Sequence, residues 1–145
     1  MRVVVNRVKE SNVLVDGNIV GKCNNGLMIL SCFKEGDSIK EIEYLVKKCV
    51  NLRIFDDEQG VMNKSILDVN GSILSISQFT LYADANKGNR PSYIKALNGE
   101  KAKELYDLFN QKLSEFIHTE TGVFGADMKI NASLDGPVTI IIDSK

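Results

Sequence analysis

The sequence predicts a β-rich α/β single domain, residues 1–145, with two β layers and two main helices on one side. Three observations lead to this fold class. The length suits one domain, short apolar runs separated by Asp-Gly and Asn-Gly pairs are typical of strands, and only two segments have helical spacing. Because two helices cannot cover both faces of seven or more strands, we expect strands to pack on strands elsewhere.

The first 33 residues are predicted to form antiparallel strands. The turns between them are Asp16-Gly17-Asn18 and Asn24-Asn25-Gly26, whose residue types tolerate the backbone angles of tight turns. This pattern indicates a meander, in which each strand follows the last in the sheet. The apolar runs with strand character lie at 3–8, 13–15, 19–22 and 27–33.

Two helices follow from a change in the spacing of apolar residues. Ser38 and Glu41 form a capping-box pattern that opens the first helix, and Asn98 can cap the second. Each helix has an apolar stripe on one face, so each should bury that side against the sheet. The stripes are Ile42, Leu45, Val46, Cys49 and Leu52 in the first helix, and Ala102, Leu105, Tyr106, Phe109, Leu113, Phe116 and Ile117 in the second.

The segments around the helices are expected to be strands and loops. They are strands at 53–55 and 73–81, an acidic loop at 56–60 and a polar, basic loop at 84–92. Two final strands, at 128–134 and 138–143, meet at Asp135-Gly136-Pro137. From residue types alone this triplet predicts a hairpin turn, because glycine tolerates unusual backbone angles and proline interrupts a strand ladder.

Composition narrows the possible functions. The net charge of −1 removes the simplest argument for nucleic-acid binding, so any RNA contact needs a local cluster of Lys and Arg. The apolar run at the N-terminus is too short for a secretory signal, and no run of 18 apolar residues could span a membrane. Cys23, Cys32 and Cys49 are odd in number and have no C-x-x-C spacing, which indicates reduced thiols in a cytoplasmic protein.

The usual catalytic motifs are absent from the sequence. The single histidine, His118, follows the second apolar stripe and is expected to be solvated, and one histidine supplies too few soft ligands for zinc. There is no G-x-S-x-G, P-loop or G-x-G-x-x-G motif, and the acidic run 56–58 is expected to be a solvated turn. A hydrolase that pairs His118 with a serine stays open as an alternative.

The segment Ser77–Leu81, with sequence SQFTL, stands out because its polar residues fall on both faces of an apolar strand. Side chains alternate along a strand, so Ser77 and Phe79 would share one face while Gln78 and Thr80 share the other. Two interpretations remain open at this point. The segment is either a strand end passing into solvent or the wall of a pocket.

Several motifs together resemble the D-aminoacyl-tRNA deacylases. They are SQFTLYAD at 77–84, RPS at 90–92, TGVFGADM at 121–128 and DGPVT at 135–139, with Asn6-Arg7-Val8, VDG at 15–17 and NLRIFDDEQGVMN at 51–63. The likeness runs in order from the first residue to about Asp143. It implies the two-layered deacylase fold and hydrolysis of the ester between a D-amino acid and the terminal adenosine of tRNA.

The resemblance also implies how members behave. They clear glycine from mischarged tRNA, leave L-aminoacyl-tRNA alone, and so act in chiral proofreading during translation. They are cytoplasmic homodimers with two sites at the subunit interface, and they need neither a metal nor an organic cofactor.

The resemblance carries roles to individual residues. Gly136 and Pro137 would be joined by a cis peptide bond and enter the partner's pocket, braced by Arg7. Phe124 would stack on the terminal adenine, and Met128 would line the same cleft. The aminoacyl pocket would be lined by Ser77, Gln78, Phe79 and Thr80.

Thr80 is also a candidate nucleophile by this resemblance, but a threonine hydroxyl needs an adjacent base. No His or Lys lies near Thr80 in the sequence. Assistance by the ribose 2′-hydroxyl of the substrate is therefore the better hypothesis.

Lys87, Arg90 and Lys95 form the basic group nearest to the SQFTL segment. They are either a solvated loop or contacts to the tRNA backbone. Two other classes of protein also remain open. One is an RNA-binding module without catalysis, and the other is a dimeric interaction protein whose apolar faces pair.

Overall fold

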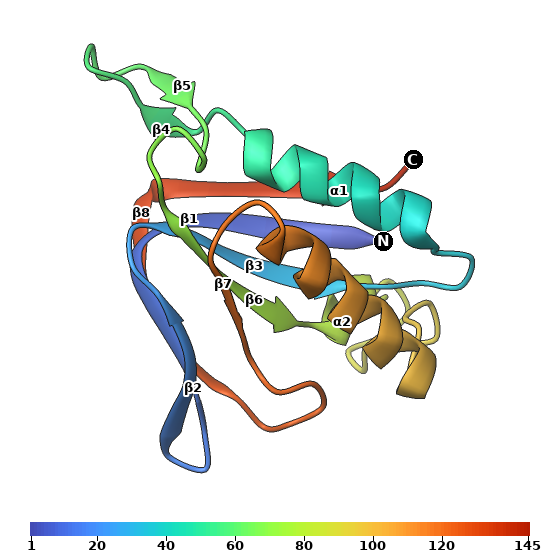
Figure 1. Cartoon of the computed structure of the whole chain (residues 1–145). Coiled ribbons are helices and arrows are strands. Elements are labelled where there is room, and N and C mark those ends of the chain that lie inside the picture. Colours follow the sequence, from blue (N-terminus) through green and yellow to red (C-terminus); the bar gives the residue numbers. More distant parts are fainter.

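The computed structural model describes all 145 residues and has one continuous mixed α/β domain (Figure 1). The predicted fold class is confirmed. The helical elements are α1 (Ile39–Asn51), the 3-10 helix η1 (Phe79–Tyr82) and α2 (Gly99–Ser114). The strands are β1 (Arg2–Val15), β2 (Asn18–Cys23), β3 (Gly26–Cys32), β4 (Phe55–Asp56), β5 (Met62–Lys64), β6 (Ser72–Ser77), β7 (Thr119–Thr121) and β8 (Lys129–Asp143).

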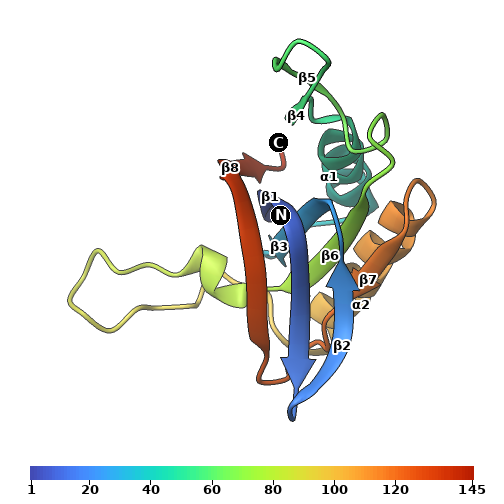
Figure 2. The same cartoon turned by 90° about the vertical axis from the view of Figure 1, so that its left-hand side faces the viewer.

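Six strands form one sheet around the long strand β1. Strands β3, β6 and β7 follow β1 in that order, β2 pairs with the second half of β1, and β8 pairs along the opposite edge of β1. The β1 pairs are antiparallel, whereas β3–β6 and β6–β7 are parallel. Strands β4 and β5 form a separate small hairpin at one end. Figure 2 shows this sheet with both helices on one side of it, as predicted.

The meander predicted for the first strands is wrong in its connections. Strands β2 and β3 do not pair with each other but lie one after the other along the same edge of β1. Ser11 pairs with Cys23 and Val8 with Gly26, so the register continues across the expected turn. The chain bends at Asn24–Gly26 rather than reversing. Likewise, the two strands expected at 3–8 and 13–15 are a single strand.

The two β layers are the two ends of this one curled sheet. Beyond the bend, β2 crosses over to β7, and a Cβ on Gly21 would lie 2.4 Å from the Thr121 carbonyl oxygen. Such close backbone contact explains why glycine is required there. A small apolar core fills the curl, made of Val8, Val13, Cys23, Met28, Leu74 and Ile76.

The helices cover the outer face of the sheet and bury the main core. Ser38 and Glu41 form the predicted capping box at the start of α1. Asn98 is the N-cap residue of α2, but its side chain makes no capping hydrogen bond. Helix α2 ends at Ser114, earlier than its apolar stripe suggested, and Phe116 is exposed. Neither helix has the length and apolarity needed to cross a membrane.

The strand expected at 73–81 stops at Ser77. Gln78 makes the last backbone bond to β3, from its N–H to the Ser31 carbonyl at 2.8 Å. The chain then closes into η1, where Leu81 N donates to Gln78 O and Ala83 N donates to Thr80 O. The predicted alternation of faces from Ser77 to Thr80 is therefore wrong, because 3-10 geometry replaces the strand.

Asp135-Gly136-Pro137 does not form the hairpin turn that its residue types suggested. Strand β8 runs through it as one strand, and the triplet bulges out of the ladder. Asn6 pairs with Thr139 and Val8 with Leu134, so four residues of β8 stand opposite Arg7 alone. The Gly136–Pro137 peptide bond is cis, as the resemblance implied, and Gly136 has φ +118°.

Candidate active site

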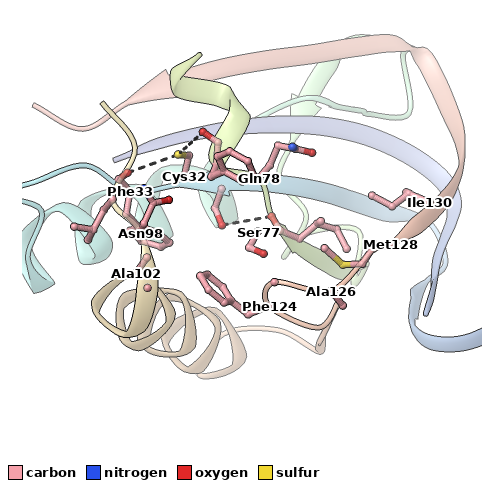
Figure 3. Close-up of a pocket in the computed structure, with 16 residues that line it drawn as sticks. Cys32, Phe33, Ser77, Gln78, Asn98, Ala102, Phe124, Ala126, Met128 and Ile130 are labelled. Atoms are coloured by element: carbon pink, nitrogen blue, oxygen red, sulfur yellow. Dashed lines mark hydrogen bonds between the residues drawn. The ribbon is translucent and has the colours of Figure 1, made fainter. Parts of the chain in front are cut away.

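A cavity of about 380 Å³ opens where β3 and β6 end (Figure 3). Ligands of parallel sheets commonly bind beyond the carboxyl ends of the strands, and these two strands are parallel. Four segments line it: 31–33, 76–79, the start of α2 at 97–99 with Ala102, and 124–130 apart from Asp127 and Lys129. Ten of the sixteen lining residues are hydrophobic, so the cavity suits a ligand with large apolar faces.

Five predicted site residues come together at this cavity. Ser77, Gln78 and Phe79 line it from the end of β6, while Phe124 and Met128 line it from the loop before β8. Figure 3 shows Phe124 between α2 and the end of β6. Its ring packs against Tyr106 with ring centroids 5.7 Å apart, and Phe79 packs edge-on against Tyr93 at 5.1 Å.

Thr80 lies beside the cavity but is not among the residues that line it. Its hydroxyl oxygen accepts a hydrogen bond from the Gln78 side-chain amide at 2.5 Å. This bond spans the first turn of η1 and orients both side chains. The hydroxyl makes no other hydrogen bond within the protein, so no base in the chain contacts it.

Two lining segments were missed by sequence reasoning. Residues 31–33 lie at the end of β3, whose parallel pairing with β6 was not predicted, and 97–99 lead into the first residue of α2. The first N–H groups of a helix have no partner inside the helix, so the start of α2 presents the positive end of its dipole to the cavity. The Asn-Gly pair at 98–99 was the only sequence feature in this segment, and it indicated the start of a helix rather than a binding site.

Cys32 is the one titratable side chain that lines the cavity. Its thiol donates to the Phe79 carbonyl oxygen at 3.3 Å, and burial raises its pKa to about 11. The thiol is therefore protonated at neutral pH and holds η1 in place rather than acting as a nucleophile.

No carboxylate, histidine, lysine or arginine lines the cavity. His118 lies elsewhere, exposed, with its Nε2 3.2 Å from a Glu120 carboxylate oxygen. A hydrolase that pairs His118 with a serine therefore has no support from this cavity. No three His, Cys, Asp or Glu side chains gather anywhere in the chain as a metal site would require. The cavity can bind and orient a ligand, but it contains no strong acid or base.

The bulge at Gly136 and Pro137 is braced from inside by Arg7, whose side chain is only 10% exposed. Arg7 Nε donates to the Asp135 carbonyl oxygen at 3.3 Å and lies 3.2 Å from the Asp135 carboxylate. A second guanidinium nitrogen, Nη1, donates to the Ile54 carbonyl at 2.6 Å. Gly136 and Pro137 are exposed on the outer side of the bulge and do not line the cavity of their own chain.

The basic loop projects away from the body of the domain, as Figure 2 shows. Asp84 and Ser92 close its base with two backbone hydrogen bonds, of 2.8 and 2.9 Å. Lys95 is paired with Asp84 at 3.1 Å, whereas Lys87 and Arg90 are exposed and form no ion pair. The free positive charge of the predicted group therefore belongs to Lys87 and Arg90.

Residues 4–143 match the family model described as D-Tyr-tRNA(Tyr) deacylase. The chain belongs to the D-Tyr-tRNA(Tyr) deacylase family. The "D-aminoacyl-tRNA deacylase" of Clostridium tetani (strain Massachusetts / E88) is 57% identical over 146 residues, covering 100% of this chain and 98% of that one. The resemblance stated from the motifs is confirmed. The chain is an enzyme, a deacylase that hydrolyses D-aminoacyl-tRNA.

Solved structures agree with the deacylase fold. The "c-Myc DNA Unwinding Element Binding Protein" has a TM-score of 0.94 and 37% identity, covering 100% of this chain and 99% of that one. A "probable eukaryotic D-amino acid tRNA deacylase" has a TM-score of 0.83, with 98% of each chain covered. Its identity is 18%, so this second likeness supports the fold alone.

Proposed function

We propose that this deacylase releases D-amino acids from tRNA while rejecting L-aminoacyl-tRNA, and that it also clears mischarged glycyl-tRNA. This activity is chiral proofreading, a form of translation quality control, and we assign it to the cytoplasm. The observation that carries the proposal is the exposed backbone bulge at Gly136-Pro137, held against Arg7 beneath it. It presents main chain rather than side chains to a ligand.

Such a bulge can distinguish D-aminoacyl from L-aminoacyl groups by steric exclusion. An L side chain and a D side chain leave the α-carbon in opposite directions, so a rigid backbone wall on one side admits only one of them. Glycine has no side chain to exclude. A filter of this kind therefore also admits glycyl-tRNA, which is why both parts of the proposal stand together.

The positions of the cavity and the Gly136-Pro137 bulge support a homodimer with sites at the subunit interface. The bulge does not line the cavity of its own chain, so a second copy is needed to bring them together. Exposed apolar side chains on β8 support this arrangement, since Leu134 is 52% and Ile141 65% exposed. Exposed apolar side chains of this kind are typical of interfaces.

The cavity would hold the aminoacylated 3′ end of tRNA. Phe124 offers a ring for the terminal adenine, and base stacking on an aromatic ring contributes about 1–3 kcal/mol. Ser77, Gln78 and Phe79 would hold the aminoacyl group, with Met128 along the same wall. The exposed pair Lys87 and Arg90 would contact tRNA phosphates, whereas Lys95 is neutralised by Asp84.

Hydrolysis would then depend on orientation and on the substrate itself. No strong base lines the cavity, and none contacts the Thr80 hydroxyl, whose oxygen accepts a hydrogen bond from the Gln78 amide. A water molecule could attack the ester with help from the neighbouring ribose 2′-hydroxyl, while backbone N–H groups stabilise the developing negative charge. Thr80 is then a positioning residue for the pocket.

Gly136→Ala should lower hydrolysis of D-Tyr-tRNA by about 100-fold or more, because small displacements in a site have effects of this size. The new Cβ would lie 3.1 Å from Arg7 Nη2 and 3.0 Å from Val138 Cγ2, at a φ of +118° that disfavours alanine. Turnover of D-Tyr-tRNA and L-Tyr-tRNA is measured side by side, with glycyl-tRNA as a third substrate.

The control for this prediction is Gly60→Ala, at φ +75° with nothing within 4 Å of the new Cβ. It introduces similar backbone strain away from the site and should retain activity. Equal turnover of D-Tyr-tRNA and L-Tyr-tRNA by the wild type would refute the chiral part of the proposal. Binding of tRNA without any turnover would favour the RNA-binding module.

A substrate whose terminal adenosine lacks the 2′-hydroxyl should be hydrolysed about 100-fold more slowly or worse, the usual lower range for loss of a proton-transferring group. Single-turnover rates compare the two esters at saturating enzyme. The matched protein variant is Thr80→Val, which removes the hydroxyl but keeps the shape and should lose far less activity. A large loss in Thr80→Val with normal turnover of the deoxy substrate would reverse the assignment.

The interface site predicts complementation between two inactive variants, Gly136→Ala and Phe124→Ala. In a mixed dimer, one site would receive both defects and the other none. An equal mixture after subunit exchange should therefore recover about a quarter of the wild-type activity, since half the dimers are mixed and half their sites are intact. Analytical ultracentrifugation tests whether the chain is a dimer and whether the subunits exchange. If both elements act within one chain, the mixture stays inactive.

Neutralising Lys87 and Arg90 together should weaken tRNA binding and reduce the slope of log K against log salt by about 1 to 2. Binding of deacylated tRNA is titrated at several salt concentrations. The control is Lys101→Ala with Lys103→Ala, which removes the same charge from pairs with Glu35 and Asp107. An equal slope in both double variants would exclude the basic loop as a phosphate contact.

A further inference from the structure

Three polar side chains are buried directly behind the cavity, between β6 and α2. Ser75 is 0% exposed, Tyr106 2% and Asn110 8%. Burying polar groups in an apolar core is unfavourable unless they form hydrogen bonds, so a cluster of three is conspicuous there. Neither the cavity lining nor the sequence motifs assign these residues a role.

The hydroxyl of Tyr106 is the organised element of this cluster. It donates to the Ser75 carbonyl oxygen at 2.8 Å. Burial raises the pKa of the Tyr106 hydroxyl. The hydroxyl therefore stays protonated at neutral pH and remains a donor to β6. By contrast, the Ser75 hydroxyl and the Asn110 side-chain oxygen make no hydrogen bond within the protein.

The same carbonyl oxygen also fixes the start of the loop that lines the cavity. Gly122 N donates to Ser75 O at 3.0 Å, at the point where β7 gives way to the loop carrying Phe124 and Met128. A Cβ on Gly122 would lie 2.6 Å from the Met128 sulfur, so that residue packs directly over the glycine. One acceptor on β6 thus holds both the loop and the Tyr106 hydroxyl.

The ring of Tyr106 packs against Phe124 from the side of the main core. The two ring centroids are 5.7 Å apart, and the planes are tilted by 42°. Tyr106 packs in the main core, where Phe124 is a partly buried neighbour. Because the hydroxyl bond restrains the Tyr106 ring, it also restrains the surface on which Phe124 rests.

We propose that Tyr106 is a positioning residue for the adenosine end of the substrate, acting through Phe124. Its hydrogen bond to the Ser75 carbonyl fixes the Tyr106 ring. That ring in turn fixes the position and tilt of the Phe124 ring, on which the terminal adenine stacks. Tyr106 therefore governs affinity for the terminal adenosine and leaves the chemical step alone. This inference rests on the adenine-stacking role given to Phe124 in the proposed function.

The test is Tyr106→Phe, which removes one oxygen and keeps the ring with its apolar contacts. Loss of one such hydrogen bond should raise KM for D-Tyr-tRNA about fivefold, with kcat unchanged. The dissociation constant of a non-hydrolysable probe, the amide analogue of 3′-D-tyrosyl adenosine, should rise by the same factor. Isothermal titration measures this binding independently of turnover.

Two controls isolate the hydroxyl. Ser75→Ala removes a hydroxyl that makes no hydrogen bond but keeps the carbonyl that Tyr106 uses, so its KM and probe affinity should match the wild type. Tyr44→Phe makes the same change on α1, away from the cavity, and should also be silent. Thermal unfolding of each variant checks that the fold is kept.

A double-mutant cycle with Phe124→Leu tests whether Tyr106 acts through Phe124. If it does, Tyr106→Phe should have little further effect on probe affinity once the Phe124 ring is gone. Additive effects, an unchanged KM and probe affinity in Tyr106→Phe, or an equal loss in Ser75→Ala would each overturn the inference.

These outcomes remain separate from those of the proposed function. If the wild type fails to hydrolyse D-Tyr-tRNA but Tyr106→Phe still weakens the probe, the deacylase proposal fails and the positioning role holds. If the wild type hydrolyses normally and Tyr106→Phe binds the probe as tightly, the positioning role fails alone.

Discussion

The pairing of β1 with three other strands is the constraint on which the rest of the structure depends. One edge of this 14-residue strand carries β8, and the other carries β3 and then β2. Because β2 and β3 continue in one register, the hairpin they form with β1 is long enough to bend. That bend brings β2 over β7 and curls a single sheet into two layers.

The same ladder explains how the Gly136-Pro137 bulge is supported. Four residues of β8 stand opposite Arg7, so their backbone cannot be satisfied by β1 alone. The nearly buried Arg7 guanidinium supplies donors to the Asp135 carbonyl and carboxylate and to the Ile54 carbonyl beyond α1. A buried charge is tolerated only when it is paired and hydrogen-bonded, so the bulge and Arg7 stabilise each other.

The cavity arises from the parallel part of the sheet, away from this bulge. Strands β3 and β6 end side by side, η1 turns the chain aside, and the start of α2 closes one wall. Its recognition groups are mostly aromatic rings, hydroxyls and main-chain amides, with no strong acid or base among them. A site of this kind depends on precise placement, which gives weight to buried supports such as Cys32 and Tyr106.

Local sequence determined the elements whose signals lie within a few residues. The capping box at Ser38, the two helical stripes and the strands β2 and β3 needed only local spacing. The motifs around Ser77, Phe124 and Gly136 identified the family, and five of the residues that they named line one cavity. Tertiary structure alone decided that Asn24–Gly26 is a bend, that η1 replaces the end of a strand, and that Asp135–Pro137 is a bulge. In each case a distant strand supplies or withholds the hydrogen-bond partners, and no local propensity encodes which strand that is.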